Sequence, residues 1–173
     1  AKGLAKEFDI EYLSGGDILK ELAEEQGFQT KGDDWWDTQE GINFLDQRKK
    51  NSEFDKNVDN KLKELFSKGG IVLTSYTLPW LVEGGVKIWL DGSKENSALR
   101  MTTRDNSSKN EALEIVQKRY SENKIIYKEL YGFEFGEDLS VFDKIIETDG
   151  LNVEQVLEIA KSTVREFFDT KTT

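Results

Sequence analysis

The stretch Glu11-Tyr-Leu-Ser-Gly-Gly-Asp-Ile-Leu19 combines the local signals of an α/β fold. Residues 11–14 form a short extended segment, and Gly15 and Gly16 predict a turn directly after it. Asp17 is a suitable N-cap residue for the apolar helical pattern that follows. The stretch therefore predicts a strand, a glycine turn and a helix in immediate succession.

The sequence on both sides continues this alternation of helices and strands. Apolar residues at helical spacing predict further helices over these segments: 4–8, 54–68, 94–104, 113–130 and from Asn152 onward. A capping-box pair, Asp37 and Glu40, predicts one more helix. Short apolar runs predict strands at 71–75, 86–90 and 144–148. Strands separated by helices of about ten or more residues favour right-handed crossovers, so we expect an α/β protein whose parallel sheet carries helices on both faces.

The composition is acidic and excludes several kinds of chemistry. The 173 residues contain 34 Asp and Glu against 24 Lys and Arg, a formal net charge of -10, so we do not expect general nucleic-acid binding. The chain has no Cys and no His, which excludes thiolate nucleophiles, imidazole bases and Cys/His zinc sites. Any chemistry must use carboxylates, Arg, Lys, hydroxyls, backbone dipoles or a hard cation.

The length corresponds to one ordinary domain. No low-complexity linker marks a boundary, so we expect a single domain over residues 1–173. No apolar run approaches the roughly 20 residues that span a bilayer. Because no signal-peptide pattern opens the chain either, we expect a cytoplasmic protein that does not contact a membrane.

Residues that follow the predicted strands are the first candidates for a site, because ligands of an open parallel sheet bind beyond the carboxyl ends of its strands. They are Ser14 to Asp17, Thr74 to Trp80, and Asp91 to Ser93. The first of these segments opens a helix, whose N–H groups can bind an anion or whose Asp17 can bind the edge of a base. A plain N-cap explains the same residues.

Three arginines suggest a phosphate site. Arg100 and Arg104 are four residues apart and share a helix face, and Arg119 lies on the next predicted helix. Converging guanidinium groups would bind phosphate bidentately, although surface ion pairs explain them equally well. The polar segment 105–110, with Ser107 and Ser108, is either a mobile lid over such a site or a plain connection between helices.

Tryptophans and paired carboxylates also have two interpretations. The tryptophans either stack on a nucleobase or pack in the core, which is the commoner use of this residue; they are Trp35, Trp36 and Trp80. Asp55 and Asp59 are spaced four apart and could form a carboxylate pair. The flanking Lys56 and Lys61 favour a solvated helix face instead.

A set of segments in a fixed order points to a known family. The segments are Tyr12–Ile18, Glu53–Asp59, Ile71–Leu73, Val86–Leu90, Arg100–Arg104, Tyr127–Gly132, Asp138–Asp143 and Ile146–Thr148. Together they resemble the archaeal type of cytidylate kinase, a nucleoside monophosphate kinase of the P-loop fold. The ordered set covers nearly the whole chain, and segments 35–41 and 75–80 look like those of a divergent branch.

The resemblance implies phosphoryl transfer from ATP, with Mg²⁺, to CMP or dCMP in pyrimidine nucleotide metabolism. It implies a monophosphate-binding region over residues 17–68 and a lid over about 100–119. Its matching positions imply substrate binding by Ser14, Gly16, Asp17, Lys20 and Tyr76, and catalysis by Arg100, Arg104 and Arg119. We expect a monomer whose partners are these nucleotides.

The sequence departs from the family pattern at three positions. Tyr76 and Ile126 stand where the family has arginines, and Lys20 is a point charge where an arginine fork is usual. The acceptor therefore stays open among CMP, dCMP, UMP and AMP. Two alternatives also stay open: a non-catalytic nucleotide-binding or interaction module on the same fold, and a related small-molecule kinase with another acceptor.

The family pattern also begins with a strand and a GxxxxGK[ST] loop, whose N–H groups and lysine hold the ATP phosphates. Neither is present in the sequence, so no residues are assigned to the ATP phosphates. We expect a three-layer P-loop kinase fold without its first strand, an incomplete domain that lacks about 15 to 20 N-terminal residues. We expect the chain as given to be inactive for this reason.

Overall fold

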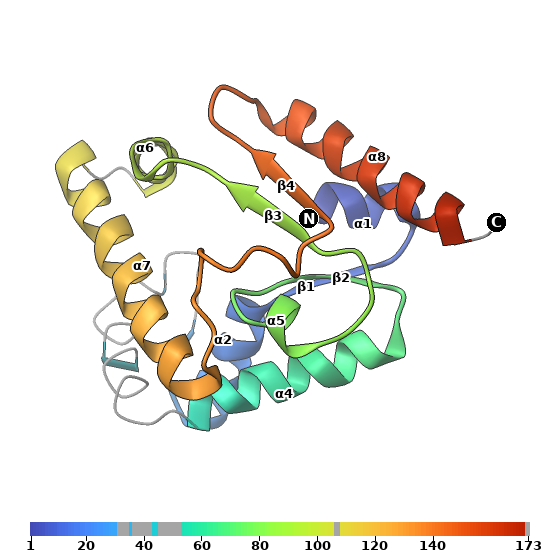
Figure 1. The fold of residues 1–173 in the computed structure, drawn as a ribbon. Coiled ribbons are helices and arrows are strands. Elements are labelled where there is room, and N and C mark those ends of the chain that lie inside the picture. Colours follow the sequence, from blue (N-terminus) through green and yellow to red (C-terminus); the bar gives the residue numbers. More distant parts are fainter. Residues whose placement is uncertain (31–34, 36–42, 45–52, 106–107, 172–173) are drawn as a thin grey trace. The chain divides into compact units, whose positions relative to one another are not determined.

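The computed structural model describes residues 1–30, 35, 43–44, 53–105 and 108–171. Contacts within the chain gather into two compact units, Ala1–Val82 and Glu83–Thr173, and each is described by itself. Figure 1 shows helices and short strands alternating along both units. The chain is therefore a mixed α/β protein, as the sequence predicts.

The first unit contains a parallel pair of short strands. Its described elements are α1 (Lys2–Phe8), β1 (Glu11–Ser14), α2 (Gly15–Glu25), α4 (Glu53–Lys68), β2 (Ile71–Thr74) and α5 (Leu78–Leu81). In the pair, Glu11 lies opposite Ile71 and Ser14 lies opposite Thr74. Both strands therefore end at the same edge, where α2 and the segment before α5 begin.

The core of the first unit forms around an aromatic side chain of the 43–44 segment. The ring of Phe44 meets Phe28 at 5.3 Å, Trp35 at 5.6 Å and Phe54 at 5.2 Å between centroids. Apolar side chains of α2 and α4 close the same core; they are Ile18, Leu19, Ala23, Val58 and Leu62. The core interpretation of Trp35 is confirmed, Trp80 is half-buried, and Trp36 lies outside the described residues.

The second unit contains another parallel pair of strands. Its described elements are β3 (Ile88–Asp91), α6 (Lys94–Asp105), α7 (Lys109–Tyr131), β4 (Lys144–Glu147) and α8 (Val153–Lys171). Ile88 lies opposite Lys144 and Asp91 lies opposite Glu147, so these strands also end at one edge. Helices α6 and α7 pack together around a small cluster of Ala98, Met101 and Ala112.

Reciprocal capping bonds explain where α7 and α8 begin. Ser108 Oγ accepts from Glu111 N at 3.4 Å, and the Glu111 carboxylate accepts from Ser108 N at 3.1 Å. Asn152 and Gln155 exchange two bonds of 2.9 Å in the same way, as the sequence predicts for α8. Ser108 thus belongs to a helix start, whereas Ser107 lies outside the described residues and the lid stays a prediction.

Aromatic rings fill the space between α7 and β3 in the second unit. Phe135 is buried and meets Trp89 at 5.6 Å, Tyr120 at 5.7 Å and Tyr127 at 5.6 Å between ring centroids. Trp89 also meets Phe142 edge-on at 5.3 Å. This cluster joins β3 to α7 and to the segment that leads into β4.

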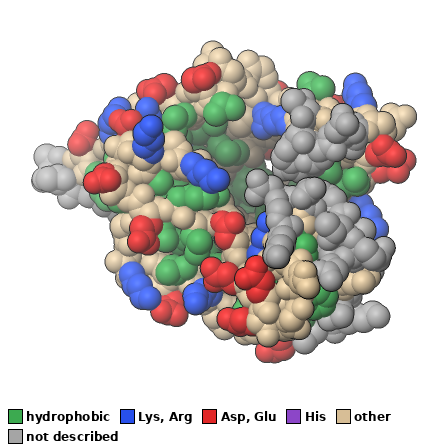
Figure 2. Space-filling model, turned by 180° about the vertical axis from the view of Figure 1, so that it is seen from behind, with side chains coloured by type: hydrophobic (Ala, Val, Ile, Leu, Met, Phe, Trp, Pro, Cys, Tyr) green, Lys and Arg blue, Asp and Glu red, His purple; other side chains and the backbone are tan. Residues whose placement is uncertain are grey.

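The surface carries side chains of both charges, as expected from a sequence with 34 Asp and Glu and 24 Lys and Arg. Figure 2 shows acidic and basic side chains interspersed over the face that it draws. None of the described helices is both long and apolar enough to cross a membrane.

The structure corrects one expectation about α4 and adds a helix that the sequence did not predict. Asp55 and Asp59 are only 6% and 4% exposed, so the expectation of a solvated face was wrong. The reason is α5, which packs against α4 and brings the Thr77 hydroxyl to the Asp59 carboxylate. The predicted helix start at Asp37 lies outside the described residues, as does much of the region 17–68.

The described strands pair as two parallel two-stranded sheets, β1 with β2 and β3 with β4. The parallel direction agrees with the sequence analysis. A single sheet over the whole chain stays a prediction, because no hydrogen-bonded strand pair links β2 to β3 among the described residues.

Candidate functional site

The carboxyl ends of β1 and β2 bring together most of the residues predicted to bind the acceptor. Because Ser14 lies opposite Thr74, the start of α2 lies beside the beginning of the β2–α5 segment. A Cβ on Gly15 would lie 3.6 Å from the carbonyl oxygen of Thr74, so α2 begins close against β2. Gly16 follows in the first turn of α2 and is exposed, whereas Lys20 lies one turn later and is half-buried.

Ser14 and Asp17 form a capping box at the start of α2. The Ser14 hydroxyl accepts from Asp17 N at 3.0 Å, and the Asp17 carboxylate accepts from Ser14 N at 3.0 Å and from the Ser14 hydroxyl at 2.6 Å. The predicted turn at Gly15 and Gly16 is thus the first turn of the helix itself, with Ser14 as the N-cap. Asp17 caps the helix, and its recognition of a base stays a prediction.

The segment between β2 and α5 is a tight hydrogen-bonded turn. The Ser75 hydroxyl accepts from the backbone N–H groups of Thr77 and Leu78, each at 3.1 Å. It also lies 3.2 Å from the Thr77 hydroxyl, which donates to the buried carboxylate of Asp59. Tyr76 stands between these anchored residues and is 61% exposed at the strand edge.

Sequence analysis missed the roles of Asp59 and Thr77 in this turn. The spacing of Asp55 and Asp59 drew attention to the carboxylates, but lysine neighbours favoured solvent. The available signal was the polar triplet Ser75-Tyr-Thr77 directly after a strand, which is typical of a side-chain-bonded turn.

The carboxyl ends of β3 and β4 form a second polar edge, in the second unit. Thr148 N and the Thr148 hydroxyl both donate to the carbonyl oxygen of Asp91 at 2.7 Å. Arg100 Nη2 donates to the carbonyl oxygen of Thr148 at 3.1 Å and to its hydroxyl at 2.9 Å. Arg100 therefore ties α6 to the end of β4.

Asp149 completes this edge by capping the start of α6. Its carboxylate accepts from Ser93 N at 3.1 Å and from the side-chain amide of Asn96 at 2.7 Å. A hydrogen bond from the Ser93 side chain, followed by the bond from the Asn96 side chain, lowers the pKa of Asp149 from its ordinary value, and the bond from Ser93 N adds to this. A Cβ on Gly92 would lie only 2.8 Å from the Thr148 hydroxyl, so the close approach of the two strand ends requires glycine there.

The three candidate arginines have different settings. Arg100 reaches the strand edge, and Arg104 lies one turn later on α6, with its side chain outside the described part of the chain. Arg119 lies on α7 and is exposed. Convergence of all three on one phosphate group stays a prediction.

Acidic clusters do not supply a metal site in the part of the chain that the structure describes. No three carboxylates converge there as potential ligands.

Comparison with known proteins places the chain in a family. A family model described as "Cytidylate kinase-like family" matches residues 1–150. The chain belongs to this cytidylate kinase-like family, and the resemblance stated from the sequence is confirmed.

Relatives from archaea carry the name cytidylate kinase. The protein from Methanocaldococcus jannaschii is 31% identical over 169 residues, which cover 95% of this chain and 88% of the relative. The protein from Sulfurisphaera tokodaii is 30% identical over 168 residues, which cover 94% of this chain and 85% of the relative.

A solved structure shares the fold at much lower identity. It is an uncharacterized protein from Eubacterium ventriosum, with a TM-score of 0.65 and 15% identity. The match covers 96% of this chain and 89% of that chain. At this identity the likeness concerns the fold alone.

Proposed function

We propose that the protein transfers a phosphoryl group from ATP to CMP or dCMP in the cytoplasm. The observation that carries this proposal is the match of the cytidylate kinase-like family model to residues 1–150. The proposal includes a monomer with one three-layer P-loop kinase domain over residues 1–173, with a monophosphate-binding region at 17–68 and a lid at about 100–119.

The acceptor would bind at the carboxyl edge of β1 and β2. The first turn of α2 presents backbone N–H groups and the positive end of the helix dipole, which favour a monophosphate. Ser14, Gly16 and Asp17 lie at this turn, and Lys20 adds a cation one turn later. Tyr76 would face the nucleoside from the neighbouring strand end.

The arginines would act on the transferring phosphoryl group. Phosphoryl transfer requires an in-line arrangement and compensation of negative charge, which guanidinium groups provide without His or Cys. We assign this role to Arg104 and Arg119, while Arg100 would also hold α6 at the end of β4. Mg²⁺ bound to ATP would neutralise charge on the phosphates.

Tyr76 and Ile126 favour a second candidate function. Both stand where the family pattern has arginines, and Tyr76 is largely exposed at the acceptor edge. A tyrosine binds a nucleoside by stacking and hydrogen bonding and supplies no positive charge to a phosphate. The alternative is thus a module that binds nucleotides without transfer, or a kinase for a different small acceptor.

The test measures binding and turnover separately. Calorimetric titration gives the affinity of the purified chain for CMP, dCMP, UMP and AMP, and chromatography follows formation of the corresponding diphosphates from ATP with Mg²⁺. We expect CMP or dCMP to bind most tightly. Because the sequence contains no GxxxxGK[ST] loop, turnover is also measured with the strand and loop of the family pattern added at the N-terminus. Diphosphate formation by that protein supports the kinase, and CMP binding without turnover by that protein supports the binding module. Preference for UMP, AMP or no nucleotide contradicts the assignment of the acceptor.

A further inference from the structure

We infer that Asp59 is a positioning residue of the acceptor site, because its buried carboxylate holds, through the Thr77 hydroxyl, the turn that presents Tyr76 to the nucleoside. This inference rests on the proposed function and adds to it a residue that does not itself touch the acceptor. The residue that recognises the nucleoside is Tyr76, and the β2–α5 turn holds its backbone in place.

The first step is the burial of the pair. Asp59 is 4% exposed and Thr77 is 3% exposed, and the Thr77 hydroxyl donates to Asp59 Oδ1. A carboxylate taken out of water is unfavourable unless hydrogen bonds compensate it, so its partners are held firmly. The Asp59 carboxylate therefore fixes the position of Thr77 relative to α4.

The second step is the geometry of the turn. Thr77 and the buried Leu78 are bound through their N–H groups to the Ser75 hydroxyl at 3.1 Å, so the residues on both sides of Tyr76 are anchored. Tyr76 itself is 61% exposed. Anchored neighbours leave the backbone of Tyr76 little freedom, and an aromatic side chain with a fixed backbone binds at a low cost in conformational entropy.

The third step is the location of the turn. It follows β2 directly, and the register places the end of β2 beside Ser14 at the start of α2. A Cβ added to Gly15 would lie 3.6 Å from the carbonyl oxygen of Thr74, so the start of α2 packs closely against the end of β2. The exposed ring thus belongs to the edge where the monophosphate would bind, and Asp59 lies beneath that edge on α4.

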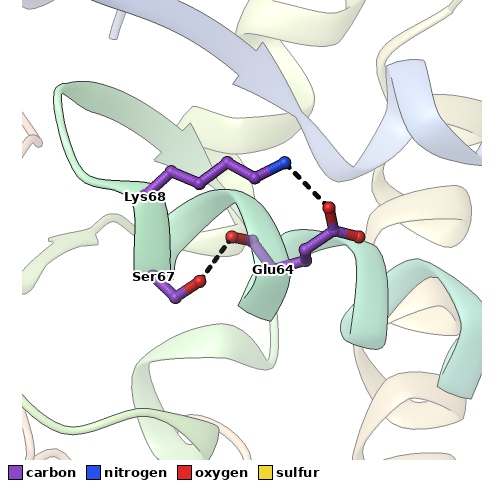
Figure 3. Close-up of polar contacts among 3 residues, drawn as sticks. All are labelled: Glu64, Ser67 and Lys68. Carbon is purple, nitrogen blue, oxygen red and sulfur yellow. Dashed lines mark hydrogen bonds and ion pairs between the residues drawn. The ribbon is translucent and has the colours of Figure 1, made fainter.

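Thr77→Val tests the connection, because valine keeps the shape of threonine and removes its hydroxyl. Thr77→Ser is the conservative variant that retains the hydroxyl. Glu64→Gln is a matched control on the same helix, since the exposed Glu64 carboxylate accepts from Lys68 Nζ at 2.8 Å (Figure 3). Asp59→Asn provides a second disruption if Thr77→Val does not fold.

Hydrogen exchange gives a readout that needs no ligand. We expect the amides of Thr77 and Leu78 to exchange about 10-fold faster in Thr77→Val, because the loss of a buried hydrogen bond frees the turn. Thr77→Ser and Glu64→Gln should leave this exchange unchanged. Equal exchange in Thr77→Val and the wild type would overturn the inference.

Titration with CMP tests whether the turn acts through Tyr76. We expect Thr77→Val to raise the Kd for CMP by about 10-fold, and to have no effect in a Tyr76→Ala background, because a positioning residue loses its effect with the side chain it positions. Thr77→Ser should restore the wild-type Kd. Additive effects of Thr77→Val and Tyr76→Ala would show a merely structural role and overturn the inference.

The two proposals fail in distinguishable ways. CMP binding that Thr77→Val leaves unchanged overturns the positioning role of Asp59 and leaves the proposed function intact. A wild-type chain that binds none of the tested monophosphates overturns the proposed function and the acceptor role of the turn with it.

Discussion

Asp17 is the clearest case of a side chain for which two roles must be separated by measurement. Its carboxylate accepts two hydrogen bonds from Ser14 in the capping box. We expect Asp17→Ala to lower the free energy of unfolding by about 0.5 to 1.5 kcal/mol, because the hydrogen bonds from Ser14 to its carboxylate are lost while the backbone N of residue 17 still donates to the Ser14 hydroxyl. Urea denaturation measures this difference. Asp17→Asn, which keeps an acceptor, is the control, and its free energy of unfolding should fall by only a few tenths of a kcal/mol.

Recognition of cytosine by Asp17 is a separate prediction. A carboxylate accepts a hydrogen bond from the exocyclic amine of cytosine and meets another acceptor in uracil. We therefore expect a preference for CMP over UMP of about 10-fold to 100-fold in the wild type, which Asp17→Ala abolishes. The ratio of the two affinities is measured by titration. An unchanged ratio would restrict Asp17 to capping.

Arg119 is the arginine whose assignment is easiest to test without disturbing the strand edge. In the protein with the strand and GxxxxGK[ST] loop of the family pattern added at its N-terminus, we expect Arg119→Ala to lower kcat for CMP phosphorylation by an amount equal to about 2.7 to 4 kcal/mol. KM should change little, because the charge of Arg119 would act on the transition state. Steady-state kinetics measure both constants. Lys118→Ala, also exposed on α7, is the control. Near-wild-type kinetics in Arg119→Ala would end its assignment.

Some residues of the site follow from sequence and others require the fold. The capped start of α2 could be predicted because a cap depends on residues close in the chain, although the N-cap is Ser14 and not Asp17 as expected. Asp59 and Thr77 could not, because 18 positions separate them and their hydrogen bond depends on how α5 packs against α4. The contact of Arg100 with Thr148 spans 48 positions and was missed for the same reason.

Among the elements, α6 begins at a carboxylate that follows the neighbouring strand β4. Asp149 accepts from Ser93 and Asn96 at the start of α6, and these bonds lower its pKa from 3.8. A carboxyl group whose pKa is lower in the folded state stabilises the fold above its unfolded pKa. This contribution is lost as the pH falls through the folded value.

The lowered pKa of Asp149 predicts how the stability of the Asp149→Asn variant compares with that of the wild type at different pH values. We expect the variant to be less stable than the wild type at about pH 7, and the difference to narrow as the pH falls below the ordinary pKa of 3.8. Urea denaturation of both proteins at several pH values measures it. A difference that is independent of pH would show that the charge of Asp149 contributes nothing.

Element boundaries were predicted well where local signals mark them. The strand 11–14 and the helix start at Asn152 agree with the structure to the residue, because a cap or a glycine adjoins each. Helix α5 was missed because it spans only Leu78–Leu81 and contains the single proline of the chain, so it has no helical period to detect. Its absence from the sequence analysis explains the wrong expectation for Asp59.

For the whole molecule, the acceptor should protect one strand edge and leave the other unchanged. We expect CMP to slow hydrogen exchange at the first turn of α2 and at Thr77, and to leave it unchanged at Ser93 and Asn96 at the start of α6. Mass spectrometry of peptides from the two units measures the effect. Protection of Ser93 and Asn96 by CMP, or of neither region, would contradict the assignment of the acceptor to the edge of β1 and β2.

The division into Ala1–Val82 and Glu83–Thr173 was outside the reach of the sequence. Composition changes little along the chain, and no linker separates the two parts. The parallel direction within each strand pair was predictable from the helices that separate the strands, whereas the partner of each strand depends on long-range contacts.

The ring cluster of the second unit gives that unit an optical signal of its own. Trp89 meets Phe135 and Phe142 edge-on, while the buried Trp35 meets Phe44 in the first unit. Rings fixed in asymmetric packing produce near-ultraviolet circular dichroism, which disappears when packing is lost. Trp89→Phe would remove the indole signal of that cluster and keep the Trp35 signal. The melting curve of the variant would then report the first unit, and its difference from the wild-type curve would report the second.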